Sequence, residues 1–404
     1  MNSTALERNL LKPEWAPKSD ELRGLLGDRI GQPGQTCSEL DSRFYLPLAG
    51  VKCRVALQFD GTSISSVEAG PAFDPEQWAE ISSAMDALLH TAPSKVGRNI
   101  TFSTHRPTSW WRGQKSGVQI LPPPTGAPSI PWEMGAHPFV LEFPVHADTS
   151  FQVMNGRRLR EHRRLTRLLN VVLKADVTCE TLLLEHVWAI EPGSGSQPRS
   201  AWLQRSYLGA DLGEIIADSV AATSGTPMEV LPPEEYYARI GHDSVLRVPS
   251  DLDESICRYQ SLMPEYREKY DRALFWLDIA SRHWPSSMSS SYSALVTAVE
   301  ALTERGAVHK AHCPECQADR THESPGPTAR FKDFFEKYAP GSSRRGQRDD
   351  MYRLRSMISH GSGLIAFDEG RAVGWDPPWS RHRDLHEVLW SITRTAMRNY
   401  LAAH

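Results

Sequence analysis

Long apolar runs are absent from this 404-residue sequence, which never approaches 18 uninterrupted apolar residues. The N-terminal stretch MNSTALERNLLKPEWAPKSDELRG also lacks a basic start followed by an apolar core. Neither a transmembrane helix nor a secretory signal peptide is therefore expected. We expect a cytoplasmic protein with no membrane partner.

Cysteine is scarce, and neither sign of charge dominates. Four of the six cysteines are scattered singly, which is typical of reduced thiols in a reducing compartment. The formal net charge of −4 excludes a globally basic nucleic-acid coat. Contacts with a polyanion would have to come from local basic patches.

The composition is that of a folded protein, and the length favours more than one domain. The pattern changes at VPSDLDES (248–255), after which it is almost wholly helical. We predict an α+β domain over residues 1–250, followed by an all-α helical bundle over residues 251–404. No internal repeat relates the two parts.

The N-terminal part mixes strand patterns with helical ones. A helix should begin at Pro75, because Asp74 is a good N-cap and proline suits the first helical position. The predicted strands are VKCRVALQF (51–59), FVLEFPV (139–145) and ETLLLEHVWAI (180–190). Two segments rich in proline, glycine and serine are predicted to be loops: LPPPTGAPSIP (121–131) and EPGSGSQPRS (191–200).

The C-terminal part has the pattern of five amphipathic helices. Apolar residues recur at helical spacing from Ile256 to Trp284, and Pro264 marks the start of the continuous helix. The other four stripes contain Tyr292, Leu295, Val296, Val299 and Leu302; Phe331, Phe334, Phe335 and Tyr338; Met351, Leu354 and Ile358; and Leu385, Leu389, Ile392, Ala396 and Tyr400. Short connections between such helices favour a bundle.

The fourth of these helices ends in RLRSMISHGSG, which places Arg355 five residues before His360. On an ideal helix His360 lies opposite the apolar stripe, and the five-residue step separates the two side chains by about 140°. Ser356, four residues before His360, shares its face. The glycines that follow can form a left-handed helix end. The histidine then falls in the last turn, where the helix dipole favours its protonated form.

Two interpretations fit this pattern. A histidine that titrates near neutrality can remove the 2′-hydroxyl proton of RNA or protonate the leaving 5′-oxygen, and an arginine can stabilise the charge on the phosphate. Alternatively, the histidine caps helix carbonyls, the arginine pairs with a carboxylate, and neither reacts. The spacing by itself is compatible with both.

The segment MYRLRSMISHGSG resembles the signature of the HEPN superfamily, in which an arginine, a polar residue, three further residues and a histidine occur within a helical bundle. Arg355, Ser356 and His360 match the three motif positions, with serine in place of the more common asparagine, aspartate or histidine. The order of SSYSALVTAVEALTERG, ARFKDFFEKYAP and the motif is similar to the ApeA-like branch, over residues 255–403.

This resemblance implies an endoribonuclease that needs no metal for catalysis, with roles in antiviral defence or toxin systems. The family forms a composite site from two domains, and one motif is visible here, so the resemblance implies a homodimer acting on RNA through Arg355, Ser356 and His360. Some relatives bind without cleaving, so the alternative is a non-catalytic scaffold for dimerisation and RNA or protein binding. The two-part layout suggests that residues 1–250 sense a phage- or stress-derived trigger or select the substrate.

Charged residues near the motif also have two interpretations. Glu300 could orient Arg355 or His360 through a salt bridge, or it could be an exposed acid on a helix surface. A basic run before the motif could be a solvated loop and helix start, or it could bind RNA through Arg344, Arg345, Arg348 and Arg353.

The N-terminal part contains a helix pattern, NGRRLREHRRLTRLLNVVLKAD (155–176), with one apolar face and one strongly basic face. Its basic residues, which could pair with acids or bind a polyanion, are Arg157, Arg158, Arg160, Arg163, Arg164 and Arg167. Trp110 and Trp111 could stack on bases together with Arg112, or they could pack in a core or between domains.

A Cys-x-x-Cys pair, Cys313 and Cys316, lies between the second and third predicted helices of the bundle. It supplies half of a tetrahedral zinc shell, which His309 and His322 could complete more easily than His312, the direct neighbour of Cys313. The other interpretations are reduced thiols in a polar loop and, with less support, a redox pair. A zinc ion here would be structural and would take no part in catalysis.

The zinc interpretation predicts about one zinc ion per chain in protein purified without added metal, measured by plasma mass spectrometry. Cys316→Ala should release it, because three ligands hold the ion more weakly than four. Cys257→Ala, a change at an isolated cysteine, should leave the zinc content unchanged. Equal metal content in all three proteins would contradict a Cys-x-x-Cys site.

Overall fold

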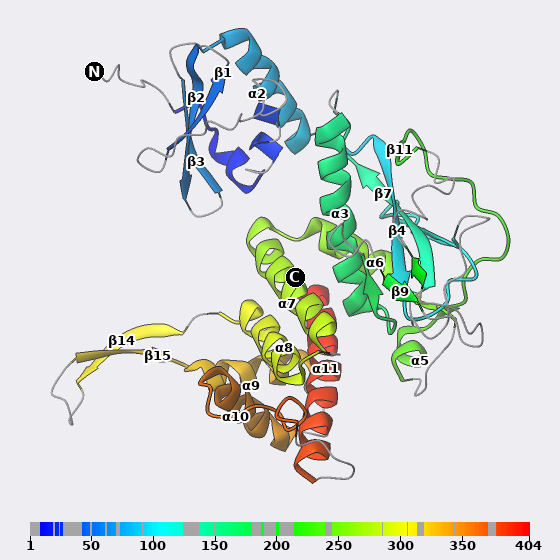
Figure 1. Ribbon diagram of the computed structural model, residues 1–404, viewed down its shortest axis with the longest axis vertical. Coiled ribbons are helices and arrows are strands. Elements are labelled where there is room, and N and C mark those ends of the chain that lie inside the picture. The colour runs from blue at the N-terminus through cyan, green and yellow to red at the C-terminus, as the bar shows by residue number, and fades with distance from the viewer. Residues whose placement is uncertain are drawn as a thin grey trace. The chain divides into compact units, whose positions relative to one another are not determined.

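The structure is a computed structural model (Figure 1). It describes residues 9–18, 21–23, 25–26, 43–48, 51–60, 63–69, 73–90, 92–123, 137–148, 151–179, 187–189, 199–201, 214–238, 245–284, 286–304, 306–312, 319–341, 345–370 and 377–404.

The chain divides into two compact units, each built from separated segments. One comprises Met1–Asn99, Glu142–His162 and Gly213–Ala222; the other comprises Ile100–Leu141, Arg163–Leu212 and Thr223–His404. This division differs from the contiguous domains predicted to meet near residue 250. The reason is that two strands and one long helix of the N-terminal part run from one unit into the other.

The first unit contains an antiparallel sheet. Its strands, in spatial order, are β1 (Arg43–Leu48), β2 (Val51–Asp60) and β3 (Ser63–Ala69). Strand β2 confirms the strand predicted over 51–59. The apolar core of this unit also takes side chains from a short 3₁₀ helix, η1 (Pro13–Lys18), and from α2 (Pro75–His90).

Helix α2 begins where the sequence predicted. The Asp74 carboxylate accepts a hydrogen bond from the backbone N–H of Glu76 at 3.0 Å, which satisfies a donor that the first turn leaves free. Ile81 and Met85, four residues apart, are fully buried against the sheet residues Leu57 and Val67.

A second sheet has the order β11-β4-β7-β6-β5, with β8 also pairing with β4. The strands are β4 (Lys95–Ser103), β5 (Trp111–Arg112), β6 (Gln119–Leu121), β7 (His137–Val145), β8 (Val177–Thr178) and β11 (Ile216–Ala217). Strand β7 confirms the strand predicted over 139–145. The strand predicted over 180–190 is described only at β9 (Val187–Ala189), which pairs with β10 (Arg199–Ala201). Most of both predicted loops, 124–131 and 191–198, lies outside the described residues.

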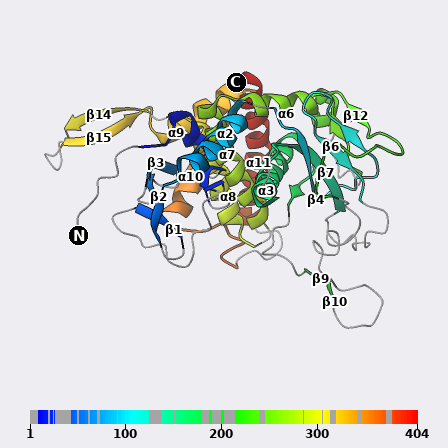
Figure 2. The same ribbon diagram turned by 90° about the horizontal axis from the view of Figure 1, so that it is seen from above.

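Helix α3 (Phe151–Val172) packs against this sheet (Figure 2). Its His162 ring stacks on Phe143, with centroids 6.1 Å apart, and its Nδ1 lies 2.7 Å from Nδ2 of Asn99. A Cβ on Gly97 would come within 2.9 Å of the Arg158 side chain, so a glycine at this position allows the helix to approach β4 closely.

The C-terminal part is mainly helical, as predicted, but the prediction that it is all-α is wrong, because residues 307–312 and 319–324 pair as a β-hairpin. Before it come the parallel strands β12 (Val230–Leu231) and β13 (Val248–Pro249) and the short α5 (Pro233–Ala238). The bundle elements are α6 (Leu252–Ser261), α7 (Pro264–His283), α8 (Met288–Leu302), the hairpin β14 (Ala307–His312) and β15 (Asp319–Ser324), α9 (Pro327–Tyr338), η4 (Arg345–Gln347), α10 (Arg348–Ser359) and α11 (Pro377–Ala403). Helix α7 begins at Pro264, as its sequence predicted. None of the helices in the described part of the chain is long and apolar enough to cross a membrane.

Buried tyrosines fix the helices of the bundle to one another. The hydroxyl of Tyr292 on α8 donates to the carbonyl of Met351 on α10 at 3.0 Å, and that of Tyr270 on α7 donates to Met397 on α11 at 3.2 Å. Both rings are fully buried. Burial raises the pKa of both hydroxyls, so they stay protonated and remain donors.

The segment after α10 is attached to the start of α8. The Asp368 carboxylate accepts hydrogen bonds from the backbone N–H groups of Met288 at 3.0 Å and Ser289 at 2.6 Å. Burial by itself would raise the pKa of Asp368, but hydrogen bonds from Ser289, Ser287 and Met288 outweigh it and lower the pKa. An ionised carboxylate therefore caps α8 from about eighty residues further along the chain.

A buried histidine joins α11 to α8. Ser291 donates its hydroxyl proton to the Ala280 carbonyl at 2.7 Å, so it accepts from Nε2 of His386, 2.8 Å away. The His386 ring is 3% exposed and packs on Trp284, with centroids 4.2 Å apart. Burial lowers the pKa of His386 to about 4, so this side chain is neutral at physiological pH.

Acid should destabilise the protein through His386. Between pH of about 6.5 and about 4 the unfolded chain binds a proton at this position that the folded chain excludes. The free energy of unfolding should therefore fall across this window as pH is lowered, by up to about 3 kcal/mol from this group. His386→Gln keeps an N–H donor for Ser291 and cannot be protonated, so its urea-unfolding free energy should depend less steeply on pH. Equal slopes for the wild type and His386→Gln would contradict this role.

Candidate functional site

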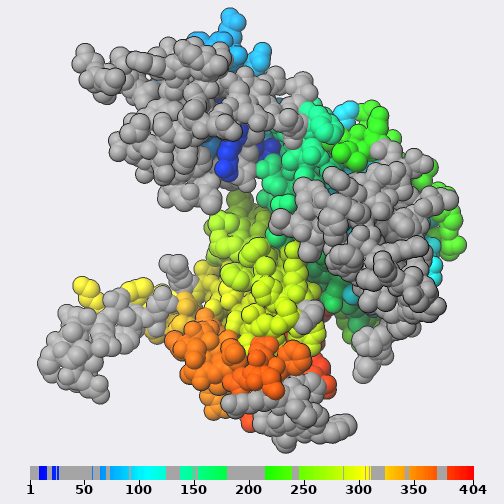
Figure 3. Space-filling model, viewed as in Figure 1, coloured from blue at the N-terminus to red at the C-terminus, as the bar shows by residue number. Residues whose placement is uncertain are grey.

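Helix α10 carries the Arg355, Ser356 and His360 motif, and its buried side chains fix its rotation. Met351 and Leu354 lie in the core, as their spacing predicted. Asp349 and Asp350 lie in the first turn, where their negative charges interact favourably with the positive end of the helix dipole. Residues of α10, in orange, reach the surface of the bundle in Figure 3.

The end of α10 is a Schellman motif centred on Gly361, whose φ is 67°. The N–H of Ser362 donates to the carbonyl of Met357 at 3.1 Å, and the N–H of Gly361 donates to Ile358 at 3.0 Å. A residue with a β-carbon would be strained at this φ, so glycine is required for the turn. The left-handed helix end that the sequence predicted is present.

His360 is the C-cap residue of α10, and its own N–H donates to the carbonyl of Ser356 at 3.0 Å. Its side chain is exposed, which agrees with the prediction that it lies opposite the apolar stripe. The backbone at His360 is thus fixed by the turn, while its imidazole faces solvent.

Arg355 is held by the neighbouring helix. Its Nη2 donates to Oε2 of Glu300 on α8 at 3.1 Å, and the Tyr352 hydroxyl donates to the other oxygen, Oε1, at 3.0 Å. The guanidinium lies 5.6 Å from the centre of the Tyr352 ring. The Arg355 and Glu300 side chains are only about a quarter exposed, at 26% and 27%, so solvent screens their ion pair incompletely. Of the two interpretations of Glu300, the structure therefore has the salt bridge to Arg355; among the described contacts, none joins Glu300 to His360.

Tyr352 contributes a second fixed donor. Burial raises the pKa of its hydroxyl, and the negative charge of Glu300 raises it further. The phenol therefore stays protonated and donates to Glu300 at neutral pH. Glu300 then accepts from two groups of α10 at once, which limits rotation of the Arg355 side chain.

Arg355 lines a pocket of about 840 Å³ that is open to solvent, called the Glu300 pocket below. It is lined by Lys269, Arg272, Glu300, Ala301, Thr303, Glu304, Pro327, Arg330, Tyr352 and Arg355. Four basic and two acidic side chains face it, so its net charge is positive. Sequence reasoning missed Lys269, Arg272 and Arg330, because their spacing on α7 and α9 gives no sign that they meet beside α10. His360 is not among the lining residues, as its separation from Arg355 around the helix predicted.

The arginines of the basic run that could bind RNA differ in their exposure. Arg344 lies outside the described residues. Arg345 and Arg353 are exposed, at 71% and 76%, and each forms an ion pair with an acid, Glu336 at 3.1 Å and Asp350 at 2.7 Å.

Arg348 has a structural role instead of the predicted RNA-binding one. It is 2% exposed, donates to Glu336 at 2.8 Å and to the Ala339 carbonyl at 3.1 Å, and so cannot reach a phosphate in solution.

The basic helix of the N-terminal part is α3, and most of its arginines are paired internally. Arg157 and Arg160 both pair with Glu21, Arg164 pairs with Asp271 at 3.7 Å, and Arg167 pairs with Asp278 at 3.3 Å. Arg158 is buried and donates to the Arg98 carbonyl. Arg163 is exposed. The interpretation of α3 as a helix paired with nearby acids is therefore favoured over that of a polyanion-binding face.

Both tandem tryptophans make contacts within the fold. Trp111 is 8% exposed within β5, and Trp110 donates its indole N–H to the Gly225 carbonyl at 3.1 Å. Packing, rather than base stacking, accounts for Trp111. Arg112 is exposed at the end of the same short strand.

The predicted zinc ligands Cys313 and Cys316 lie outside the described residues. The backbone register of the hairpin places His309 directly opposite His322, while His312 is opposite Asp319. No group of metal-binding side chains occurs elsewhere among the residues that the structure describes. The zinc site stays a prediction.

Comparison with protein-family models, with curated proteins and with solved structures gives no match to this chain. The fold defines it as a protein with a mixed helix and sheet region and a C-terminal helical region.

Removing the Glu300 charge should destabilise the bundle, because Arg355 would lose its carboxylate in a partly desolvated position. Glu300→Gln should lower the free energy of unfolding by about 1 kcal/mol in urea titrations. Glu268→Gln is the matched control, since Glu268 pairs with Arg272 on the exposed face of α7 and should matter by less than about 0.5 kcal/mol. Equal losses of unfolding free energy in the two variants would show that the contact with Arg355 contributes no more to stability than an exposed ion pair does.

Proposed function

We propose that this protein is a metal-independent endoribonuclease of the HEPN type that acts as a homodimer. One observation carries the proposal. Arg355 is fixed by Glu300 at the edge of a positively charged pocket, and the same helix presents an exposed His360 at its C-terminal cap. An oriented arginine and a solvent-accessible histidine are what phosphodiester cleavage without metal requires.

In the proposed reaction, the imidazole of one His360 removes the proton of an RNA 2′-hydroxyl. The 2′-oxygen attacks the adjacent phosphorus, and the bond from phosphorus to the 5′-oxygen breaks. The proton that the imidazole has taken up is returned to the leaving 5′-oxygen, so one histidine acts first as the base and then as the acid. Arg355 stabilises the negative charge on the phosphate oxygens. The products are a 2′,3′-cyclic phosphate and a 5′-hydroxyl.

The proposed site needs a second chain. Arg355 and His360 are five residues apart and face directions about 140° apart around α10, so within one copy they could meet on one phosphate only through the reach of the arginine. Two copies of α10 related by a two-fold axis could bring the arginine of one chain toward the histidine of the other.

The resemblance of MYRLRSMISHGSG to the HEPN signature further suggests a toxin-like or antiviral role in the cytoplasm. In that setting the N-terminal part would sense a phage- or stress-derived trigger. The alternative is a non-catalytic scaffold that dimerises and binds RNA or a protein. It is favoured by one feature of the site: Glu300 already pairs with Arg355, as it would if the arginine were structural.

The purified protein should cut single-stranded RNA in the presence of EDTA and leave 2′,3′-cyclic phosphate ends. His360→Ala and Arg355→Ala should each reduce the rate by about 100-fold or more, because one removes the proton-transfer group and the other the charge on the phosphate. His283→Ala changes another exposed histidine at a helix end and should leave the rate unaltered. Cleavage at the wild-type rate in both motif variants would refute the proposal, and RNA binding without turnover in the wild type would favour the scaffold.

Mixing the two inactive variants tests the shared site. After joint unfolding and refolding, mixed dimers combine an intact Arg355 from one chain with an intact His360 from the other. Activity should return in the mixture if the site spans two chains. A mixture as inactive as its components would mean that both residues must come from one chain.

A further inference from the structure

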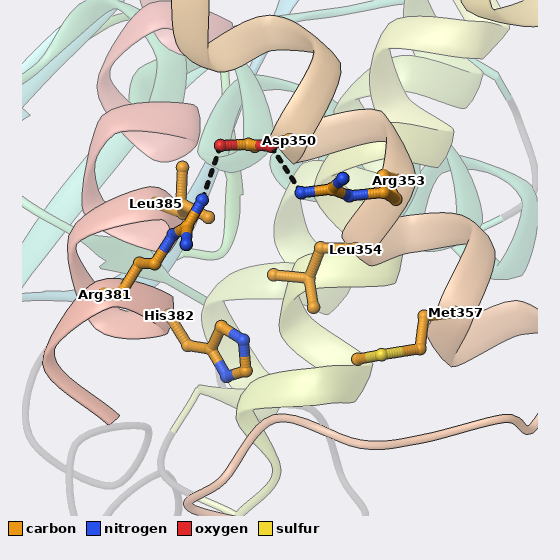
Figure 4. A pocket seen from close by; sticks show the side chains of 7 residues that line it. All are labelled: Asp350, Arg353, Leu354, Met357, Arg381, His382 and Leu385. Atoms are coloured by element: carbon orange, nitrogen blue, oxygen red, sulfur yellow. Dashed lines mark hydrogen bonds and ion pairs between the residues drawn. The ribbon is translucent and has the colours of Figure 1, made fainter. Parts of the chain in front are cut away.

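A second pocket lies on the face of α10 opposite Arg355, between α10 and α11, and is called the Asp350 pocket below. It has a volume of about 600 Å³ and is lined by Asp350, Arg353, Leu354, Met357, Arg381, His382 and Leu385 (Figure 4). On an ideal helix the α10 residues of this pocket point away from Tyr352 and Arg355, which line the Glu300 pocket. The two pockets therefore share a helix and no side chain.

One carboxylate holds the two arginines of the Asp350 pocket in place. Arg353 of α10 donates to Oδ1 of Asp350 at 2.7 Å, and Arg381 of α11 donates to Oδ2 at 2.7 Å (Figure 4). Their side chains are 76% and 63% exposed, so most of their N–H donors face solvent. Two positive charges share one negative charge, which leaves a net positive charge at the opening.

The remaining walls are apolar and contain a further donor. Leu354, Met357 and Leu385 line the interior, where they can contact a base or a ribose. The backbone N–H of Ala366 donates to Nδ1 of His382 at 3.5 Å. In the neutral ring Nδ1 is then the acceptor, and Nε2 carries the proton and can act as a donor. Burial lowers the pKa of His382, and the charge of Arg381 lowers it further, so the neutral ring is favoured.

We propose that the Asp350 pocket binds the phosphate group of a nucleotide unit, with Asp350 occupying the anion position when no ligand is present. A carboxylate offers one oxygen to each arginine. A phosphate can do the same and offer a third oxygen to His382. The volume suits one nucleotide, and the apolar wall suits its base or sugar. The nucleotide can be free or part of an RNA strand; the chemistry recognised is the same.

The site does not depend on RNA cleavage. Arg353, Arg381 and His382 are not part of the proposed catalytic set, and their contacts exist without a second chain. Loss of the proposed nuclease function would therefore leave this site intact.

Binding is measured with two probes: adenosine 5′-monophosphate by calorimetry on the wild-type chain, and a fluorescein-labelled single-stranded 12-mer RNA by anisotropy on the His360→Ala chain, which should not cleave it. Arg381→Gln and Arg353→Gln should each weaken binding of the probe by about tenfold, the loss expected for one charged hydrogen bond. Arg247→Gln is the matched control, because Arg247 also pairs with an exposed carboxylate, that of Glu229 at 2.6 Å, and does not line this pocket. Thermal unfolding of each variant checks that it is folded.

Asp350→Asn should change the affinity in the opposite direction to the arginine variants. It removes the competing anion and keeps the size of the side chain, so binding should tighten several-fold, whereas general damage to α10 would weaken it. Loss of affinity for adenosine monophosphate in the arginine variants supports a free nucleotide as the ligand, and a loss for RNA alone supports a phosphate within a strand. The proposal is overturned if the wild type binds neither probe, or if both arginine variants bind as tightly as Arg247→Gln.

Discussion

Helix α10 is held against α8 by three polar contacts that all require one register between the two helices. Tyr292 donates to the Met351 carbonyl, while Tyr352 and Arg355 both donate to Glu300. A shift of α10 by one turn would break all three and leave partly buried donors without acceptors, at a cost of about 1–3 kcal/mol each. The direction of Arg355, and with it the positions of both pockets beside α10, depends on this register.

Much of the positive charge of the protein is used to hold it together. Along α3, acids from distant segments neutralise Arg157, Arg160, Arg164 and Arg167. Arg348 is buried in the same manner next to the motif. With 45 basic and 49 acidic residues, little positive charge is left over. An anionic ligand would therefore be attracted mainly where exposed arginines outnumber acids, and both pockets beside α10 are such places.

The functional proposals converge on one helix of 12 residues. Arg353 and Arg355 are two positions apart and leave α10 on opposite sides, one toward the Asp350 pocket and the other toward the Glu300 pocket. His360 faces solvent at the end, where the Schellman turn fixes the backbone and leaves the ring accessible.

The sequence by itself determined the local features of this protein. Asp74 and Pro75 predicted the start of α2, Pro264 predicted the start of α7, and the spacing of Met351 and Leu354 predicted which face of α10 is buried. The glycine after His360 predicted the left-handed end. Such features depend on a few neighbouring residues, whose backbone preferences and periodicity are readable from the chain. Tertiary structure alone decided which charges are free. Arg348 and Arg353 belong to one basic run, yet one is buried against Glu336 and the other faces solvent. Lys269 and Arg330 line the same pocket as Arg355 only because α7 packs against α8, and α9 packs against α8 and α10. These outcomes depend on contacts between residues far apart in the chain, and no local pattern encodes them.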